Sequence, residues 1–86
     1  MVLSSLRKKI DEADLQLLEL LVRRLKISEE IAEYKRKNNM PIQDRKRELE
    51  VITKRIEKFK QLGFDDEIFV TKLFELIMRK SREVQQ

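Results

Sequence analysis

The 86-residue sequence contains no cysteine and no histidine. The lack of cysteine excludes a disulfide framework and a thiolate metal site, and the lack of histidine removes the commonest metal ligand and the usual general base near neutral pH. No long uncharged run is present, and the opening stretch MVLSSLRKKIDEAD lacks the apolar run of a signal peptide. We therefore expect a cytoplasmic protein without a membrane span, whose chemistry relies on Arg, Lys, Asp, Glu, Ser, Gln and the single Tyr34.

Glycine and proline are equally scarce, with one residue of each, whereas charged residues make up 42% of the chain and hydrophobic residues 41%. This composition is typical of a helical protein with few loops. The length fits one domain over residues 1–86, near the lower size limit at which a single hydrophobic core suffices without help such as association of copies.

The net charge of +4 favours an anionic partner. Nucleic acid is the less suitable candidate, because acidic residues are mixed among the basic ones, aromatics are only 6% of the chain, and no recognised nucleic-acid-binding motif occurs. A small anion fits the same charge. We therefore expect neither a nucleic acid nor a membrane as partner.

The few helix-breaking residues divide the chain into three helices. Pro41 ends the first helix, and Asp44 is placed to cap the second. Gly63 fits a left-handed residue after the second helix, and Asp65 or Asp66 can cap the third. The predicted fold is all-α, with one long helix and two shorter ones over residues 4–38, 44–61 and 66–84.

An apolar stripe runs along the whole first helix. A helix of this length spans about 50 Å, whereas a compact globule of this size has a radius of gyration of about 12 Å. Two shorter helices cannot cover the whole stripe, so we predict an intertwined helical homodimer, which light scattering can test. The residues of the stripe are Leu3, Leu6, Ile10, Ala13, Leu17, Leu20, Arg24, Ile27, Ile31 and Tyr34.

Cations interrupt this apolar side of the helix at Arg24 and, nearby, at Arg7 and Lys35. Two interpretations fit: the side chains reach solvent or pair with neighbouring carboxylates, or they line a pocket for an anion. Arg24 and Lys35 lie about 16 Å apart along the helix, with Ser28 and Ile31 between them on the same face. Arg7 lies about 25 Å further from Arg24, so only an antiparallel partner could bring it to the same ligand.

Two further segments carry polar residues at helical spacing. PIQDRKRELEVI places Asp44, Arg47 and Glu48 at the start of the second helix, where they serve equally well as a cap and solvated charges. LFELIMRKSREVQQ places Ser81 and Gln85 on one face, which is also compatible with the polar face of a helix end. Taken singly, neither segment specifies a site.

Together the motifs resemble the all-helical class of chorismate mutases over nearly the whole chain. The resemblance rests on four segments that occur in the family's order and spacing: LRKKIDEADLQLLELLVRR, IAEYK, PIQDRKRE and LFELIMRKSREVQ. It implies an isomerase that converts chorismate to prephenate by a Claisen-type rearrangement, at the branch toward phenylalanine and tyrosine. Such an enzyme restrains the substrate's conformation and stabilises developing charge, without covalent catalysis, metal or cofactor.

The resemblance also implies roles for the matched residues. Arg24 and, from the other subunit, Arg7 would bind the two carboxylates of chorismate. Lys35 and Gln85 would donate hydrogen bonds to the ether oxygen, where a donor acts most strongly in the transition state.

The remaining matched residues would complete the pocket. Glu48, with the backbone near Asp44, would hold the ring hydroxyl, while Arg47 and Ser81 would support the carboxylate end. The apolar walls would be Ile31, Val51 and Met78.

Two other functions are compatible with this scaffold. An isochorismate-pyruvate lyase runs related pericyclic chemistry on a similar substrate, and a helical interaction or nucleic-acid-binding module would use the basic surface without catalysis. The chain carries no second catalytic or regulatory domain of the kind fused to some relatives, so we expect a stand-alone mutase.

Overall fold

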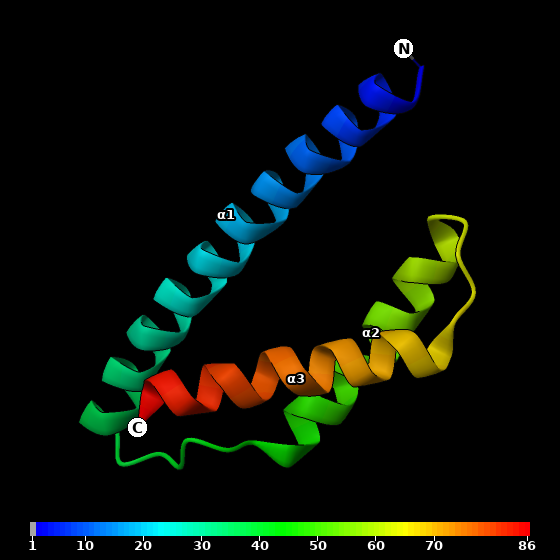
Figure 1. The fold of residues 1–86 in the computed structure, drawn as a ribbon. Coiled ribbons are helices and arrows are strands. Elements are labelled where there is room, and N and C mark those ends of the chain that lie inside the picture. The colour runs from blue at the N-terminus through cyan, green and yellow to red at the C-terminus, as the bar shows by residue number, and fades with distance from the viewer. Residues whose placement is uncertain (1) are drawn as a thin grey trace.

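The computed structural model describes residues 2–86, which form three α-helices and no strand. The helices are α1 (Val2–Lys37), α2 (Arg45–Gln61) and α3 (Glu67–Gln85), shown in Figure 1. The prediction of an all-α chain with one long and two shorter helices is confirmed. Each helix end falls within two residues of its predicted position.

The end of α1 is set by a left-handed residue before the proline. Asn39 has φ of 52°, which asparagine tolerates better than most residues. Its conformation lets the Met40 N–H reach back to the Lys35 carbonyl at 2.9 Å and satisfy an unpaired carbonyl of the last turn. Pro41 follows and prevents the helix from resuming.

The ends of α2 follow the predicted capping chemistry. The Asp44 side chain accepts a hydrogen bond from the Arg47 N–H at 3.1 Å, which caps the start of the helix. At the other end Gly63 takes φ of 105°, and the Phe64 N–H bonds the Phe59 carbonyl at 3.1 Å. The rings of these two phenylalanines lie 5.7 Å apart between centroids, which adds the apolar contact typical of this type of helix end.

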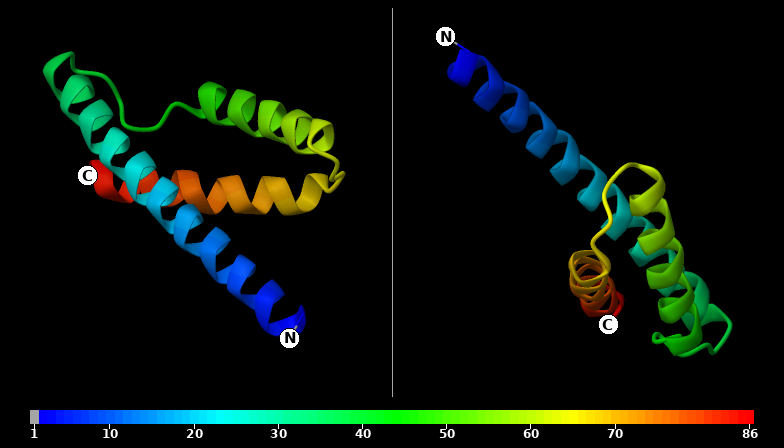
Figure 2. Two further views of the ribbon diagram at one scale, coloured as in Figure 1. Left: turned by 90° about the horizontal axis from the view of Figure 1, so that it is seen from above. Right: turned by 90° about the vertical axis from the view of Figure 1, so that its right-hand side faces the viewer.

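Helix α3 joins the other two helices. Its N-cap is Asp66, the second of the two predicted caps, whose side chain accepts from the Phe69 N–H at 3.0 Å. It packs against both α1 and α2, whereas α1 and α2 do not pack directly on each other. Figures 1 and 2 show α2 and α3 as a hairpin, with the end of α3 crossing α1.

The first half of α1 has no cover within the chain. Residues 2–20 are all exposed, and α1 extends well beyond the hairpin in both figures. The molecule measures 57 × 24 × 16 Å with a radius of gyration of 16.1 Å, which is more than the value expected for a compact chain of this length. None of the helices in residues 2–86 is long and apolar enough to cross a membrane. The buried apolar core is small, consisting of Ala32, Val51, Val70 and Met78.

Candidate functional site

A pocket of about 360 Å³ lies between the second half of α1, the first half of α2 and the last turns of α3. Residues from all three helices line it. The turn at Pro41 connects α1 to α2, and the turn at Gly63 connects α2 to α3. Ten of the eleven residues predicted for the site line this pocket. They are Arg24, Ile31, Lys35, Asp44, Arg47, Glu48, Val51, Met78, Ser81 and Gln85.

Arg7 is the predicted residue that does not line the pocket. It lies on the exposed first half of α1, seventeen residues before Arg24, or about 25 Å along the helix. A single arginine side chain does not bridge this distance, so the chain by itself does not place Arg7 at the site.

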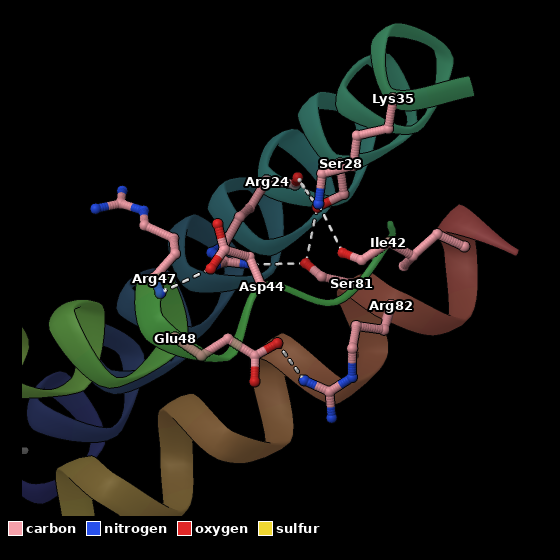
Figure 3. A network of polar contacts seen from close by, with 9 residues as sticks. All are labelled: Arg24, Ser28, Lys35, Ile42, Asp44, Arg47, Glu48, Ser81 and Arg82. Carbon is pink, nitrogen blue, oxygen red and sulfur yellow. Dashed lines mark hydrogen bonds and ion pairs between the residues drawn. The ribbon is translucent and has the colours of Figure 1, made fainter. Parts of the chain in front are cut away.

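Arg24 is held by a closed chain of hydrogen bonds (Figure 3). Its guanidinium Nη1 donates to the Ser81 Oγ at 2.7 Å, the Ser81 and Ser28 hydroxyls lie 2.7 Å apart, and the Ser28 Oγ donates to the Arg24 carbonyl at 3.1 Å. Because Ser28 gives its only proton to that carbonyl, Ser81 must donate to Ser28. Both serines are buried, so water does not compete for these contacts. The network therefore begins and ends on Arg24 and fixes its side chain.

The charge of Arg24 is poorly compensated within the chain. Burial lowers the pKa of its guanidinium below the ordinary value, and the positive charge of Arg55 lowers the same pKa further. The group nevertheless stays protonated at neutral pH, because arginine does not lose its proton in proteins. Arg55 itself stacks over the Phe74 ring, 5.9 Å from its centroid. An anion between the two guanidinium groups would offset the cost of burying the Arg24 charge and would reduce its repulsion with Arg55.

Lys35 lines the same pocket, about three turns further along α1. Its Nζ donates to the Ile42 carbonyl at 2.6 Å, which ties the segment between α1 and α2 to α1. An ammonium group has three N–H donors, so this contact leaves two of them for a ligand.

Gln85 closes the end of the pocket at the last residue of α3. The residue is only 9% exposed, and its Oε1 is buried without a hydrogen-bond partner among residues 2–86. A buried amide left unpaired is costly. This observation points to a group that completes the amide's hydrogen bonds from outside the described residues.

The start of α2 supplies a carboxylate that is already paired. The Arg82 Nη1 donates to the Glu48 Oε2 at 2.6 Å, joining α3 to α2. Arg47 lies on the preceding position, but Figure 3 shows its guanidinium extending away from the Arg24 and Ser81 network. Asp44 also lines the pocket, and its side chain serves as the α2 cap.

Sequence reasoning missed two cations of the pocket, Arg55 and Arg82. Helical spacing contained the signal, because Arg55 follows Val51 by four residues and Arg82 follows Met78 by four residues. Five cations and two carboxylates line the pocket in total, so its charge suits a small dianion. Residues 2–86 contain no group of His, Cys, Asp or Glu suited to hold a metal ion.

Comparisons with known proteins agree on one family. The family model described as chorismate mutase type II matches residues 6–86. The chain is 34% identical to the chorismate mutase of Methanocaldococcus jannaschii over 85 residues, covering 98% of this chain and 84% of that protein. It is 38% identical over 82 residues to the bifunctional chorismate mutase/prephenate dehydratase of Buchnera aphidicola subsp. Schizaphis graminum, covering 92% of this chain and 20% of that protein.

A solved structure has the same fold over the full length. The conserved hypothetical protein from Pyrococcus furiosus superposes with a TM-score of 0.79 at 38% sequence identity, covering 100% of this chain and 97% of that one. The likeness therefore includes the arrangement of all three helices.

Proposed function

The chain belongs to the chorismate mutase type II family, and we propose that its pocket rearranges chorismate to prephenate, using residues from two subunits. The family and the names of its curated relatives identify the chain as an isomerase, and they favour the mutase over a lyase or a non-enzymatic binding module. The observation that carries the assignment to this pocket is the convergence of Arg24, Lys35 and Gln85 on one cavity from two helices far apart in sequence.

Arg24 would bind one of the two carboxylates of chorismate. Its guanidinium is held by Ser81 and faces a pocket with excess positive charge. Because the side chain is fixed before the substrate arrives, little conformational entropy is lost on binding. Ser81 thus acts through Arg24, and Arg47 would add a second cation at the carboxylate end after a change of rotamer.

Lys35 and Gln85 would stabilise the transition state. As the ether C–O bond breaks, negative charge builds on the ether oxygen, and donors aimed there act more strongly in the transition state than in the ground state. Lys35 has two N–H donors beyond its bond to Ile42. Gln85 lines the same pocket, and its side-chain NH2 group, not the unpaired Oε1, would be the second donor. Both groups belong to the chain itself, so the reaction needs no cofactor.

The rest of the pocket would hold the substrate in its compact, chair-like conformer. Glu48 would accept a hydrogen bond from the ring hydroxyl, with the backbone at Asp44 beside it. Val51 and Met78 are buried and would pack on the ring and the enolpyruvyl group, as would Ile31. Bringing the two reacting carbon atoms into contact in this way lowers the entropic part of the barrier.

The second carboxylate of chorismate would be bound by Arg7 of the partner subunit. Two observations support a homodimer: residues 2–20 of α1 are all exposed, and their apolar stripe includes Leu6, Ile10 and Leu17, each at least half exposed. An isologous dimer with antiparallel α1 helices would cover this stripe and carry Arg7 of the partner subunit toward the pocket.

The direct test is to incubate the purified protein with chorismate and to follow the loss of chorismate together with the appearance of prephenate. We expect turnover by the native protein without added metal or cofactor. Isochorismate is the control substrate, since release of pyruvate from it would indicate the lyase instead. No turnover of chorismate by the folded protein would contradict the proposal.

A further inference from the structure

The ion pair between Arg82 and Glu48 differs from other ion pairs of the chain in its burial. The Glu48 side chain is 18% exposed and that of Arg82 is 26% exposed, whereas both partners of the Arg36 and Glu33 pair are more than half exposed. Exposed pairs contribute little stability because water and salt screen them. Water and salt screen the pair of Arg82 and Glu48 less. The attraction between the two charges is therefore stronger, and it restricts the movement of both side chains.

The pair also lies at the junction of the three helices. Successive residues of a helix point about 100° apart, so Ser81 contacts Arg24 of α1 while Arg82 contacts Glu48 of α2. Figure 3 shows the two contacts leaving α3 in these different directions. The last turns of α3 therefore fix one functional side chain on each neighbouring helix.

A carboxylate in a pocket for a dianion requires a compensating charge, because an uncompensated Glu48 would repel the substrate. Arg82 supplies that charge and binds only one of the two carboxylate oxygens, Oε2. The other oxygen, Oε1, has no contact marked to any residue drawn in Figure 3. One oxygen of the carboxylate is thus held by Arg82, while the other stays available as a hydrogen-bond acceptor.

We propose that Arg82 is a positioning residue that neutralises Glu48 and aims its second oxygen at the ring hydroxyl of the substrate. The inference rests on the proposed function, and it deepens it by assigning selectivity for a hydroxylated ring to an ion pair rather than to Glu48 alone. Arg82 acts through Glu48 and does not itself contact the reacting atoms.

The test compares two substrates in several variants. The substrates are chorismate and its analogue with hydrogen in place of the ring hydroxyl, and the readout is the ratio of their kcat/KM values. Arg82→Gln should lower kcat/KM for chorismate about tenfold, because the misplaced Glu48 no longer forms its hydrogen bond to the ring hydroxyl. The analogue lacks this hydroxyl, so its kcat/KM should change less than about threefold. Arg82→Lys should recover part of the ratio, because it restores the charge without the fork geometry.

Three further variants separate positioning from a structural role. Arg79→Gln removes the same charge from an exposed position one turn earlier on α3 and should leave the ratio unchanged. Glu48→Gln should reduce the ratio as Arg82→Gln does, and the double variant should lose no more than either single one. Circular dichroism and thermal unfolding verify that each variant is folded.

An equal loss for both substrates in Arg82→Gln would overturn the proposal and indicate a structural tie or a direct carboxylate contact. No change in kcat/KM for either substrate would overturn it as well. Failure of the native protein to convert chorismate would instead contradict the proposed function, so the two failures are distinguishable.

Discussion

Arg24 and Ser81 meet at 2.7 Å across the contact between α1 and α3, although they lie 57 positions apart in the sequence. The contact depends on the crossing of the two helices, and Ser28 closes the network from α1. The same helix crossing that buries Met78 therefore sets the direction of the Arg24 side chain, which we propose to bind a substrate carboxylate. Helix packing therefore determines the geometry of the proposed binding site at this point of the molecule.

The Arg24 network predicts a graded response to loss of its serines. Ser81→Ala removes the direct bond to the guanidinium and should lower kcat/KM for chorismate about tenfold, chiefly through KM. Ser28→Ala leaves that bond in place and should cost only about two- to fourfold. Steady-state kinetics of both variants test the order. A larger loss for Ser28→Ala than for Ser81→Ala would contradict the described network, in which Ser81 alone of the two serines bonds the guanidinium.

Lys35 is expected to contribute mainly to kcat. Lys35→Ala should lower kcat by about a hundredfold or more, the size of effect seen when an oxyanion donor is removed. Because the change also removes the bond to the Ile42 carbonyl, thermal unfolding should be measured on the same sample. Lys37→Ala is the matched control, since its side chain is 73% exposed on the same helix. A change of only a few-fold in Lys35→Ala would remove Lys35 from the catalytic role.

The exposed stripe of α1 predicts a face-specific effect on association. Leu17→Glu places a charge on the stripe and should shift the protein from dimer to monomer at micromolar concentration, with loss of activity, because burying an unpaired carboxylate is costly. Leu15→Glu makes the same change on the opposite side of the helix, where the leucine is 61% exposed, and should remain dimeric. Sedimentation velocity measures both. Identical behaviour of the two variants would contradict the assigned interface.

Local chemistry made the helix ends predictable from sequence. Pro41 forbids continuation of α1, Asp44 and Asp66 cap the helices that follow, and Gly63 accepts a left-handed conformation. These are interactions between residues a few positions apart, so they can be predicted from a single sequence. The cations along α1 likewise indicated that its apolar stripe has a polar section.

The contacts between helices were less predictable from the sequence. That Arg82 reaches Glu48, or that Arg55 lies near Arg24, depends on how α3 crosses its neighbours, which helical periodicity does not determine. The bond from Lys35 to the Ile42 carbonyl depends on the path of the chain after Pro41. The family resemblance predicted most of the pocket residues, but it did not predict Arg55 or Arg82.

The central claim is that each active site combines Lys35 of one subunit with Arg7 of the partner subunit. The measurement that tests it most directly is activity after mixing the inactive variants Arg7→Ala and Lys35→Ala in equal amounts, with subunit exchange verified by native mass spectrometry. Half of the dimers should then be hybrids with one complete site, so activity should return to about a quarter of the native value. Hybrid dimers that form but stay inactive would contradict the shared site.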